Sequence, residues 1–497
     1  MNIVTVHSVE RYATPAKPIP KQDSVPHGIS TIATVLKNAG HNVQMLVLSP
    51  SMDIPETIGR LISDFKPDMF CFTAVTTRFP DIRRMARHVK AENPSVFTIL
   101  GGHHATLDPE GAIAEASFDA ICRSEGETVI LELIKSLEKG DHPSGISNLW
   151  IRGKDGVIER NPIGKLHEDI DATSIIDREM WVPWIADPGA GMASVLLGRG
   201  CPFKCTYCSN QALSKLAEGR YVRFRSYDNI IKEVDQIMER WPSLNGIYLE
   251  VETFGANLKF SFELLHKLKE FNSKRETPVN FGVNLAISKK VRENPKLLDD
   301  MKEAGFTSVN IGLESGSERV RQEALQRPKY TNEDVLNFCD EARKRGIDVV
   351  FFVLMGIPGE TLEEYRETVD LVQRARPLMV YCSIFYPYPG TDLYETTKRM
   401  GLLPKTMDTN AERIRAVLDL PGFPRWRIQY EFLMFNYRTQ LNKSFPKRVA
   451  MLVKDTLSTF PRFYSLMHYF AITNPVGRFL HAKMSFKSHP TQELPKK

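Results

Sequence analysis

Short apolar runs alternate with amphipathic segments in the first part of the chain. The apolar runs are rich in β-branched and aromatic residues, as buried strands are. They begin at Asn2, Val43, Met69, Val96 and Phe118. The segments between them have helical periodicity, and the first of these ends at Gly40, a common helix stop. Strands alternating with helices predict a doubly wound, Rossmann-like parallel sheet over residues 1–143.

The alternation resumes further along the chain, after a segment of different character. Residues 144–190 contain a hairpin pattern that turns at residues 153–156, followed by a polar connector, and we interpret them as a hairpin and linker. Six more apolar runs then alternate with helical segments over residues 191–395, which predicts a partial (β/α)6 barrel. These runs begin at Ala193, Gly246, Val279, Ser308, Asp348 and Leu378. Barrel enzymes place their chemistry at the carboxyl ends of such strands.

Residues 396–497 differ from the rest of the chain in charge. From Pro421 to Lys497 there are 13 Lys and Arg residues against 3 Asp and Glu, although the net charge of the whole chain is only +5. The cations are mixed with Trp, Tyr and Phe, and we predict a basic, aromatic, mainly helical region. Three interpretations stay open: a cap over the barrel mouth, contact with a membrane surface or a lipid substrate, and contact with nucleic acid.

Composition adds a prediction about the compartment. The chain is 42% hydrophobic and 25% charged, like an ordinary globular protein. It has no signal-peptide pattern at its start and no run approaching the ~18 apolar residues that span a bilayer. Seven cysteines with three in a cluster argue against a secreted disulfide framework. We therefore expect a cytoplasmic protein, with membrane association through the basic C-terminal region as a further option.

The clustered cysteines are Cys201, Cys205 and Cys208, in the stretch CPFKCTYC. They follow the first predicted strand of the barrel, on its catalytic face. A structural zinc site needs four protein ligands, and the best fourth candidate, Cys339, lies over 130 residues away. Three thiolates would leave one position of a four-iron cluster open to a substrate or cofactor. The spacing therefore favours an iron–sulfur cluster.

This loop resembles the C-x3-C-x-aromatic-C loop of the radical S-adenosylmethionine (SAM) enzymes, with Tyr207 at the aromatic position. In that family the three cysteines hold a [4Fe–4S] cluster, whose unique iron binds SAM and reduces it to a 5′-deoxyadenosyl radical. The resemblance implies that Cys201, Cys205 and Cys208 are the catalytic residues and the metal ligands. It also implies an external electron donor of flavodoxin-like or ferredoxin-like type.

Later strand ends resemble the SAM-binding motifs of the family. Glu252 stands where relatives commonly have paired aspartates, and Asn284 stands where many have arginine. The stretches LESGSE and GIPGE match the fourth-strand and fifth-strand motifs, and we expect Glu360 in the latter to cap the next helix. For Glu314, a role as a helix N-terminal carboxylate stays open. The implied SAM contacts are Tyr207, Glu252, Asn284, Glu314, Ser315, Gly356 and Ile357.

The N-terminal domain resembles the cobalamin-binding domain of one radical SAM subfamily, in the stretches that begin at Val25, Phe97 and Phe118. In that subfamily, glycines let the backbone approach the corrin and its nucleotide tail, and helix N-termini favour phosphate. For Thr76 and Thr77, ordinary loop chemistry is an equal alternative, and for His104 packing or hydrogen bonding is an alternative to metal ligation. The implied contacts are Thr76, Thr77, Gly101, Gly102, His104, Gly126 and Glu127.

Together these resemblances imply a cobalamin-dependent radical SAM enzyme that methylates an unactivated carbon of a small-molecule, secondary-metabolite or lipid-like substrate. Such a carbon offers no proton to acid–base catalysis. The alternatives are a cobalamin-independent radical SAM enzyme (cyclisation, C–C coupling or oxidation) and, outside enzymes, a metal-binding interaction protein. Nucleic acid is the least favoured partner, because RNA-modifying relatives have extra cluster cysteines where this chain has only Cys71 and Cys122, far apart.

Overall fold

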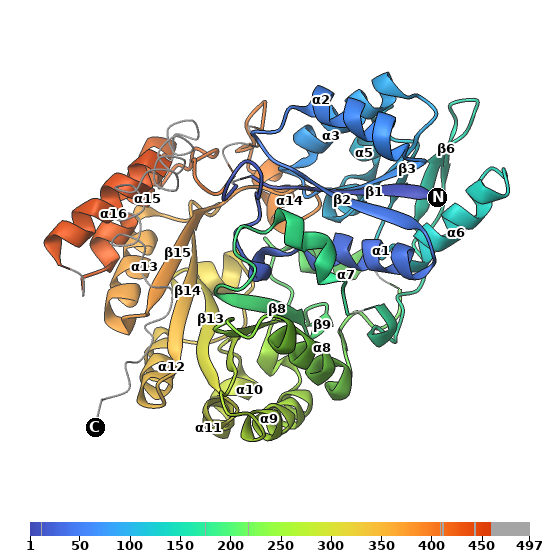
Figure 1. Ribbon diagram of the computed structural model, residues 1–497. Helices are drawn as coiled ribbons and strands as arrows, with labels where there is room; N and C mark the ends of the chain where they lie inside the picture. The colour runs from blue at the N-terminus through green and yellow to red at the C-terminus, as the bar shows by residue number, and fades with distance from the viewer. Residues whose placement is uncertain are drawn as a thin grey trace. The chain divides into compact units, whose positions relative to one another are not determined.

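The computed structural model describes residues 1–458 with a few gaps, and the chain divides into two compact units, Met1–Phe435 and Asn436–Lys497. The first unit contains both large sheets, and Figure 1 draws the N-terminal one in blue to teal and the second one from green to orange. Strands alternate with helices in both regions, so the predicted α/β fold class is confirmed. The gaps within this range are residues 11, 174, 217, 408, 410, 411, 442 and 443.

Seven strands form the N-terminal sheet: β1 (Asn2–Ser8), β2 (Asn42–Leu48), β3 (Met69–Thr73), β4 (Phe97–Gly101), β5 (Ala120–Cys122), β6 (Leu149–Arg152) and β7 (Ile158–Arg160). They lie in the order β2-β1-β3-β4-β5-β6-β7. The first five strands are parallel, whereas β6 and β7 form a hairpin that runs antiparallel to β5. The hairpin predicted within residues 144–190 therefore extends this sheet.

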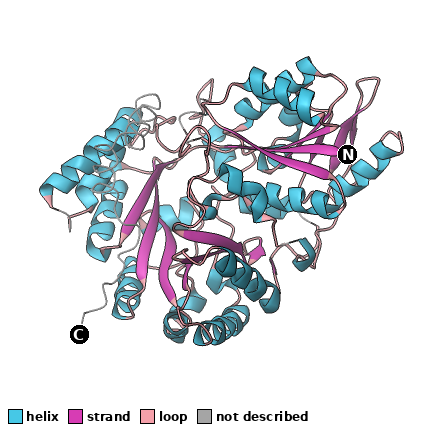
Figure 2. Cartoon of the chain, in the orientation of Figure 1, coloured by secondary structure: helices cyan, strands magenta, loops and turns pink. Residues whose placement is uncertain are grey.

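The helices of this region are α1 (His27–Asn38), α2 (Ile54–Arg60), α3 (Phe79–Glu92), α4 (His103–Leu107), α5 (Pro109–Ala114) and α6 (Glu127–Glu138). Helices cover both faces of the sheet (Figure 2). Because neighbouring strand residues face opposite sides, Ile3 packs in one core with α1 and α6, and Val4 packs in the other with α2, α3 and α5. The predicted doubly wound arrangement is thus confirmed.

Six parallel strands form the second sheet: β8 (Met192–Leu196), β11 (Gly246–Glu250), β12 (Asn280–Asn284), β13 (Phe306–Glu314), β14 (Asp348–Met355) and β15 (Met379–Ile384). All six apolar runs predicted from the sequence are strands. On β11, Ile247 and Leu249 enter the hydrophobic core under the helices, whereas Tyr248 and Glu250 lie on the opposite, inner face. The predicted partial barrel is confirmed.

The helices of the barrel follow its strands in the chain. They are α8 (Tyr227–Arg240), α9 (Leu258–Ser273), α10 (Lys289–Arg292), α11 (Lys296–Glu303), α12 (Asn332–Lys344) and α13 (Leu362–Ala375). Caps fix where several of them begin: Ser226 accepts the N–H of Asn229 at the start of α8, and Thr331 closes a capping box on α12.

The connector between the two sheets is packed against both of them. Trp181 is fully buried, and its indole N–H donates to Ser30 Oγ of α1 at 2.8 Å. Arg178, three residues earlier, donates to the carbonyl of Ser194 on β8 and to Glu233 Oε1 on α8 at 2.9 Å. One short segment therefore connects the N-terminal sheet region to the barrel through buried hydrogen bonds to both.

The described part of the C-terminal region contains the helices α14 (Asp392–Arg399), α15 (Arg425–Thr439) and α16 (Phe445–Ser458), with irregular chain between α14 and α15. The start of α15 packs on the barrel: Ile428 and Phe435 are buried, and the Tyr365 hydroxyl of α13 donates to the carbonyl of Glu431 at 3.2 Å. The predicted helical C-terminal region is confirmed over these residues, and residues 459–497 lie outside the described part. Among the described helices, none is long and apolar enough to span a membrane.

Candidate active site

The cluster loop, residues 201–208, lies between β9 (Gly198–Arg199) and α7 (Ser209–Leu216). Cys205 is buried, Cys201 and Cys208 are half-buried, and all three are free thiols. Burial raises the pKa of Cys201 to about 12, and the nearby charges of Glu252, Cys205 and Cys208 add to this effect. Such thiols would ionise and act as ligands only beside a positive centre, and an iron–sulfur cluster would supply one. Among the described residues, no group of three or more His, Cys, Asp or Glu side chains is arranged to hold a single metal ion.

A tight two-stranded ribbon leads into the cluster loop. It pairs β9 with β10 (Arg223–Phe224) and sets Arg199 directly opposite Arg223. Gly200 has a φ of +86°, and a Cβ there would collide with the carbonyl of Tyr221, so glycine is required. Two arginines facing each other repel, so the ribbon depends on carboxylates from elsewhere.

The N-terminal domain supplies these carboxylates from the loop between β5 and α6. Arg199 donates to Glu125 Oε1 at 2.8 Å and to Glu127 Oε1 at 2.6 Å, and Arg223 donates to both carboxylate oxygens of Glu125 at 2.8 and 3.0 Å. Burial alone would raise the pKa of Glu125, but the hydrogen bonds from Arg223 and the charge of Arg199 hold it below its usual range. A balanced set of charges therefore ties the N-terminal domain to the entrance of the cluster loop.

A cavity of about 390 Å³ opens at this junction, at the carboxyl ends of the N-terminal strands. Its wall includes residues of α1 and α6 together with residues that flank the cluster loop. Gly102 adopts a φ of +90°, and a Cβ there would lie 2.7 Å from Thr73 Oγ1. A glycine-edged space beside the start of α6 suits the backbone approach and the phosphate of a nucleotide-tailed cofactor. The predicted residues that line it are Gly101, Gly102, Gly126, Glu127 and Glu252.

Three of the residues predicted to contact cobalamin lie outside the lining of this cavity. Thr76 and Thr77 are in the turn after β3, and the buried Thr77 hydroxyl has no hydrogen-bond partner among the described residues. The ring of His104 packs on Phe79 with the ring centroids 4.0 Å apart, which agrees with the packing role considered for His104 from the sequence. His103 lines the cavity in its place. Burial lowers the pKa of His103, and the charge of Glu252 opposes this shift.

Tyr207 belongs to a partly buried network between the cluster loop and the end of β13. Its hydroxyl donates to Glu314 Oε1 at 2.8 Å, at the end of β13. Arg327 donates to the Tyr207 hydroxyl at 3.3 Å and lies 3.7 Å from Cys205 Sγ. Burial alone would lower the pKa of Arg327. The charges of Tyr207, Tyr330, Glu314 and Cys205 outweigh this effect and raise the pKa above its usual value. Glu314 thus contacts Tyr207 and not a helix N-terminus.

Arg327 was missed by the sequence analysis. It follows an irregular turn between β13 and α12, and no residue spacing connects it to Cys205, which precedes it by more than 120 positions. The segment after β13 brings the two together by packing on the cluster loop: the Thr206 N–H donates to the carbonyl of Leu325 at 3.1 Å, and the Thr206 hydroxyl donates to the carbonyl of Ala324 at 2.6 Å. A hydrogen bond from a cationic guanidinium to a cluster sulfur is one of the ways in which proteins tune iron–sulfur sites.

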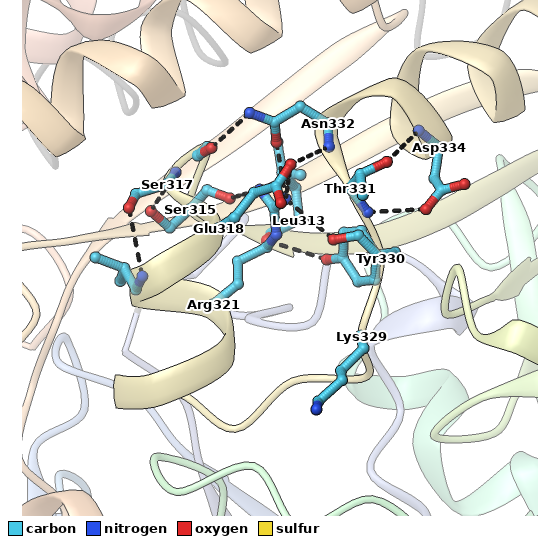
Figure 3. Close-up of polar contacts among 12 residues, drawn as sticks. Leu313, Ser315, Ser317, Glu318, Arg321, Lys329, Tyr330, Thr331, Asn332 and Asp334 are labelled. Atoms are coloured by element: carbon cyan, nitrogen blue, oxygen red, sulfur yellow. Dashed lines mark hydrogen bonds and ion pairs between the residues drawn. The ribbon is translucent and has the colours of Figure 1, made fainter.

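Two other predicted SAM contacts bond to the protein itself. Asn284 at the end of β12 accepts from the Tyr248 hydroxyl at 2.6 Å and donates to the carbonyl of Val251 at 3.1 Å. Ser315 is fully buried, and its carbonyl accepts from Arg321 at 2.6 Å in the network that Figure 3 shows. Both residues support strand ends that face the site.

The turn after β14 contains Gly356 and Ile357, whose N–H groups both donate to Glu360 Oε2, at 2.7 and 3.2 Å. Burial raises the pKa of Glu360 to about 8. The prediction that Glu360 caps the next helix is wrong, because Thr361 caps α13 and Glu364 closes the capping box. Glu360 instead stabilises the turn, because its buried carboxylate accepts hydrogen bonds from the two backbone N–H groups that would otherwise have no partner.

Known proteins share these features. A sequence model of the Radical SAM superfamily matches residues 195–372, and one of the B12 binding domain matches residues 20–134. An uncharacterized methyltransferase of Pyrococcus horikoshii is 28% identical over 384 residues, 76% of this chain and 79% of the relative. The anaerobic magnesium-protoporphyrin IX monomethyl ester cyclase of Rubrivivax gelatinosus is 26% identical over 380 residues, 74% of this chain and 66% of the relative.

Solved structures share the fold. The radical SAM methyltransferase TsrM from Kitasatospora setae, solved with cobalamin and a [4Fe–4S] cluster bound, is 17% identical to this chain. The likeness covers 91% of each chain with a TM-score of 0.66. It extends across the N-terminal sheet and the barrel, and so supports the arrangement of the two within one unit.

A parallel barrel whose first strand leads into three free cysteines is the framework of an iron–sulfur enzyme. The chain therefore has a radical SAM domain at residues 195–372 and, before it, a B12 binding domain at residues 20–134, the combination of the cobalamin-binding radical SAM subfamily. It is a radical SAM enzyme, and its cofactors are a [4Fe–4S] cluster, SAM and cobalamin. The predicted family, enzyme class and cofactors are confirmed, whereas the individual contact residues stay predictions.

Proposed function

We propose that this enzyme is a cobalamin-dependent C-methyltransferase that acts on an unactivated carbon. One observation carries the proposal: a single cavity is lined both by the glycines of the N-terminal sheet and by Gly200, Tyr221 and Glu252 beside the cluster loop. A methyl carrier held at the glycines and a radical generated at the loop would share this space. The relatives named as methyltransferases support the same reaction class.

The chain's own residues have separate tasks in this proposal. When bound, the cluster with SAM supplies a carbon-centred radical and cobalamin supplies the methyl group. Cys201, Cys205 and Cys208 hold the cluster, and Arg327 places a positive charge against Cys205 Sγ. Glu252 is the proposed acceptor for the SAM amino group, because its charge acts on both Cys201 and Cys208.

The proposed substrate space lies on the inner face of the barrel. Phe352 of β14 and Tyr381 of β15 stack there with their ring centroids 5.5 Å apart, and their side chains are 38% and 51% exposed. Exposed aromatic faces on the inner side of the barrel favour an apolar or lipid-like substrate that excludes water. The polar side is supplied by Glu250, whose pKa burial raises to about 7, with the charges of Glu252 and Asp23 adding to the shift.

A second candidate is a radical reaction other than methylation, such as cyclisation. It is favoured by the similarity to the protoporphyrin ester cyclase, which covers 74% of this chain. The cobalamin-independent enzyme considered from the sequence is not supported, because the chain has a B12 binding domain. A non-catalytic metal-binding protein is not supported, because the chain is a radical SAM enzyme. The requirement for a low-potential cluster supports a reducing compartment, so we propose a cytoplasmic enzyme. The basic C-terminal region stays the proposed site of any membrane contact.

The test is anaerobic reconstitution with iron and sulfide, followed by incubation with SAM and a reductant. The proposal expects 5′-deoxyadenosine, bound corrinoid, and label from methyl-labelled SAM in a small-molecule fraction of a cell extract. Formation of 5′-deoxyadenosine without methyl transfer would favour the cyclase-like alternative. A protein that binds zinc and no iron would contradict the radical reaction itself.

A further inference from the structure

The outer side of the cluster loop forms a surface of its own. Two depressions of about 430 and 370 Å³ lie on either side of Phe203 and share Pro202, Phe203 and Ala256 in their walls. Residues 202–204 of the cluster loop line these depressions, and none of the three lines the cavity on the inner side. The loop therefore separates a cofactor cavity from an outward-facing surface.

The walls of the two depressions are basic. They contain six Lys or Arg residues and no Asp or Glu among the described residues. Arg292 is paired with Asp334 at 2.5 Å, and Lys289 with Glu293 at 3.6 Å. In the described part of the chain, no carboxylate lies within ion-pair distance of the other four. Those four are Lys204, Arg220, Lys290 and Lys329.

The four unpaired cations are exposed and surround an apolar centre. Lys329 points away from the polar network of its own loop (Figure 3). Phe203 stands between the depressions, half-buried, beside the exposed Pro202. An apolar centre with a charged rim is the usual composition of a transient protein interface. Uncompensated like charges at such a rim attract an oppositely charged partner over a long range.

The same surface is the outer approach to the cluster ligands. Cys201 lines the larger depression, next to Pro202 and Lys204. A cluster held by Cys201 would therefore be within reach of a partner bound at this surface. SAM cleavage consumes one electron, and the chain has no second group of clustered cysteines in its sequence from which that electron could come.

We propose that this docking face, formed by Phe203 with Lys204, Arg220, Lys290 and Lys329, binds a small acidic electron-carrier protein. The proposal rests on the proposed function, since it requires a redox cluster at the three cysteines. The carrier loses one electron and the cluster gains it, and no atom or proton is transferred. Nucleic acid is the other anionic partner, but one aromatic ring beside a cluster ligand suits a compact redox protein better than an extended strand.

The test uses the reconstituted holoenzyme and flavodoxin hydroquinone, an acidic one-electron carrier. The variant carries Arg220→Glu, Lys290→Glu and Lys329→Glu, and leaves Lys204 unchanged because it lies in the cluster loop. The matched control carries Lys135→Glu, Lys139→Glu and Lys154→Glu, three exposed lysines of the N-terminal domain. Stopped-flow absorbance gives the rate of cluster reduction, and photoreduced deazariboflavin, a small uncharged reductant, bypasses docking.

The docking face predicts that flavodoxin reduces the triple variant at least about tenfold more slowly than the wild type at low ionic strength, with the difference shrinking as salt is added. Deazariboflavin should reduce the wild type, the variant and the control at the same rate. Calorimetric titration of cluster-free protein with flavodoxin should show weaker binding for the variant only. If the variant loses iron, the single changes Lys290→Gln and Lys329→Gln take its place, each with a smaller slowing.

Equal flavodoxin rates in the variant and the wild type would overturn the docking face. So would a variant that loses affinity for a short RNA while its flavodoxin rate is unchanged. Failure of the proposed function has a different signature: wild-type enzyme reduced by deazariboflavin would then form no 5′-deoxyadenosine from SAM, whatever the flavodoxin result.

Discussion

The two sides of the cluster loop differ in whether their positive charges are paired with carboxylates. On the inner side, Arg199 and Arg223 are fully matched by Glu125 and Glu127 of the N-terminal domain. On the outer side, four of the six cations in the walls of the two depressions have no carboxylate partner among the described residues. Partly buried charges must be paired, because leaving them unpaired costs several kcal/mol. Exposed cations cost little, and stay available to a partner that binds and leaves.

The same loop therefore joins a permanent contact and a proposed transient one. The permanent contact fixes the cobalamin-binding domain against the radical site, where distance decides whether a methyl group can be transferred. The proposed transient contact only has to bring an electron within reach. Changes to the two sides should consequently affect different measurements.

The largest effect is expected where the two sides meet. Replacing Cys201, Cys205 or Cys208 singly by Ala should abolish the cluster and lower 5′-deoxyadenosine formation by more than ~100-fold. The loss should be this large because each cysteine binds the cluster directly, and even residues that only support a metal ligand typically contribute about 10- to 100-fold. Iron content and the visible absorption of the cluster report the loss directly. Cys339→Ala, a change at a buried core position, serves as the control. Retained cluster in any of the three variants would contradict the assignment.

Arg327 tests whether the inner side also tunes the cluster. Removing its charge in Arg327→Gln should make the reduced cluster harder to form, so the midpoint potential should become more negative and SAM cleavage should fall by ~10-fold or more. Arg327→Lys should recover part of the potential because it restores the charge. Redox titration followed by electron paramagnetic resonance measures the shift. An unchanged potential in Arg327→Gln would show that the contact with Cys205 is only structural.

Glu125 tests the permanent contact. Glu125→Gln leaves Arg199 opposite Arg223 without enough negative charge, and should lower the free energy of unfolding by about 2 kcal/mol, less than for a fully buried pair because the site is partly exposed. It should also weaken cobalamin binding, since residues 124–127 line the cavity.

The control for Glu125 is Glu110→Gln, which removes an exposed carboxylate that bonds Arg160 at 2.9 and 3.1 Å. That change should leave stability and cobalamin binding as they are, because exposed pairs contribute little. Denaturant titration and corrinoid binding measure both properties. Equal effects of Glu125→Gln and Glu110→Gln would contradict the claim that the partly buried ion pairs contribute more to stability than the exposed one.

The smallest effect on activity is expected for Glu360, where the change is in how stability depends on pH. Its pKa is about 8 in the folded chain against an ordinary value of 4.5, so the folded state holds the proton more tightly. This contribution to stability is complete below pH 4.5 and is lost as the pH rises through about 8. The loss is up to about 1.4 kcal/mol per pH unit. Glu360→Gln should flatten the fall in the thermal midpoint of the apoprotein between pH 6 and 8, and an unaltered slope would contradict the role.

The sequence was sufficient for the fold because the buried strands are distinct apolar runs. The run that begins at Asp348 is apolar at seven consecutive positions, as strands covered on both faces are, and a helix pattern follows it. The cluster loop was equally legible, because three cysteines at short spacing need no tertiary information. Gly101, Gly102 and Gly126 were recognisable for a similar reason, since they belong to local strand-end motifs.

The contacts that cross the chain were not predictable in this way. Arg199 and Glu127 are 72 positions apart, and Arg327 and Cys205 are 122 apart. Nothing local distinguishes these arginines from solvated ones. Likewise, adjacent residues such as His103 and His104 differ only in the face of α4 on which they lie, and that was fixed by packing on Phe79.

The most direct test of the account measures corrinoid and radical chemistry in the same preparation. Protein expressed with cobalamin, reconstituted anaerobically and gel-filtered, should contain stoichiometric corrinoid and iron, and should form 5′-deoxyadenosine from SAM. Glu125→Gln should lose much of the corrinoid while keeping its iron. A preparation that is consistently free of corrinoid, yet forms 5′-deoxyadenosine and product at full rate, would contradict the cobalamin-dependent methyltransferase.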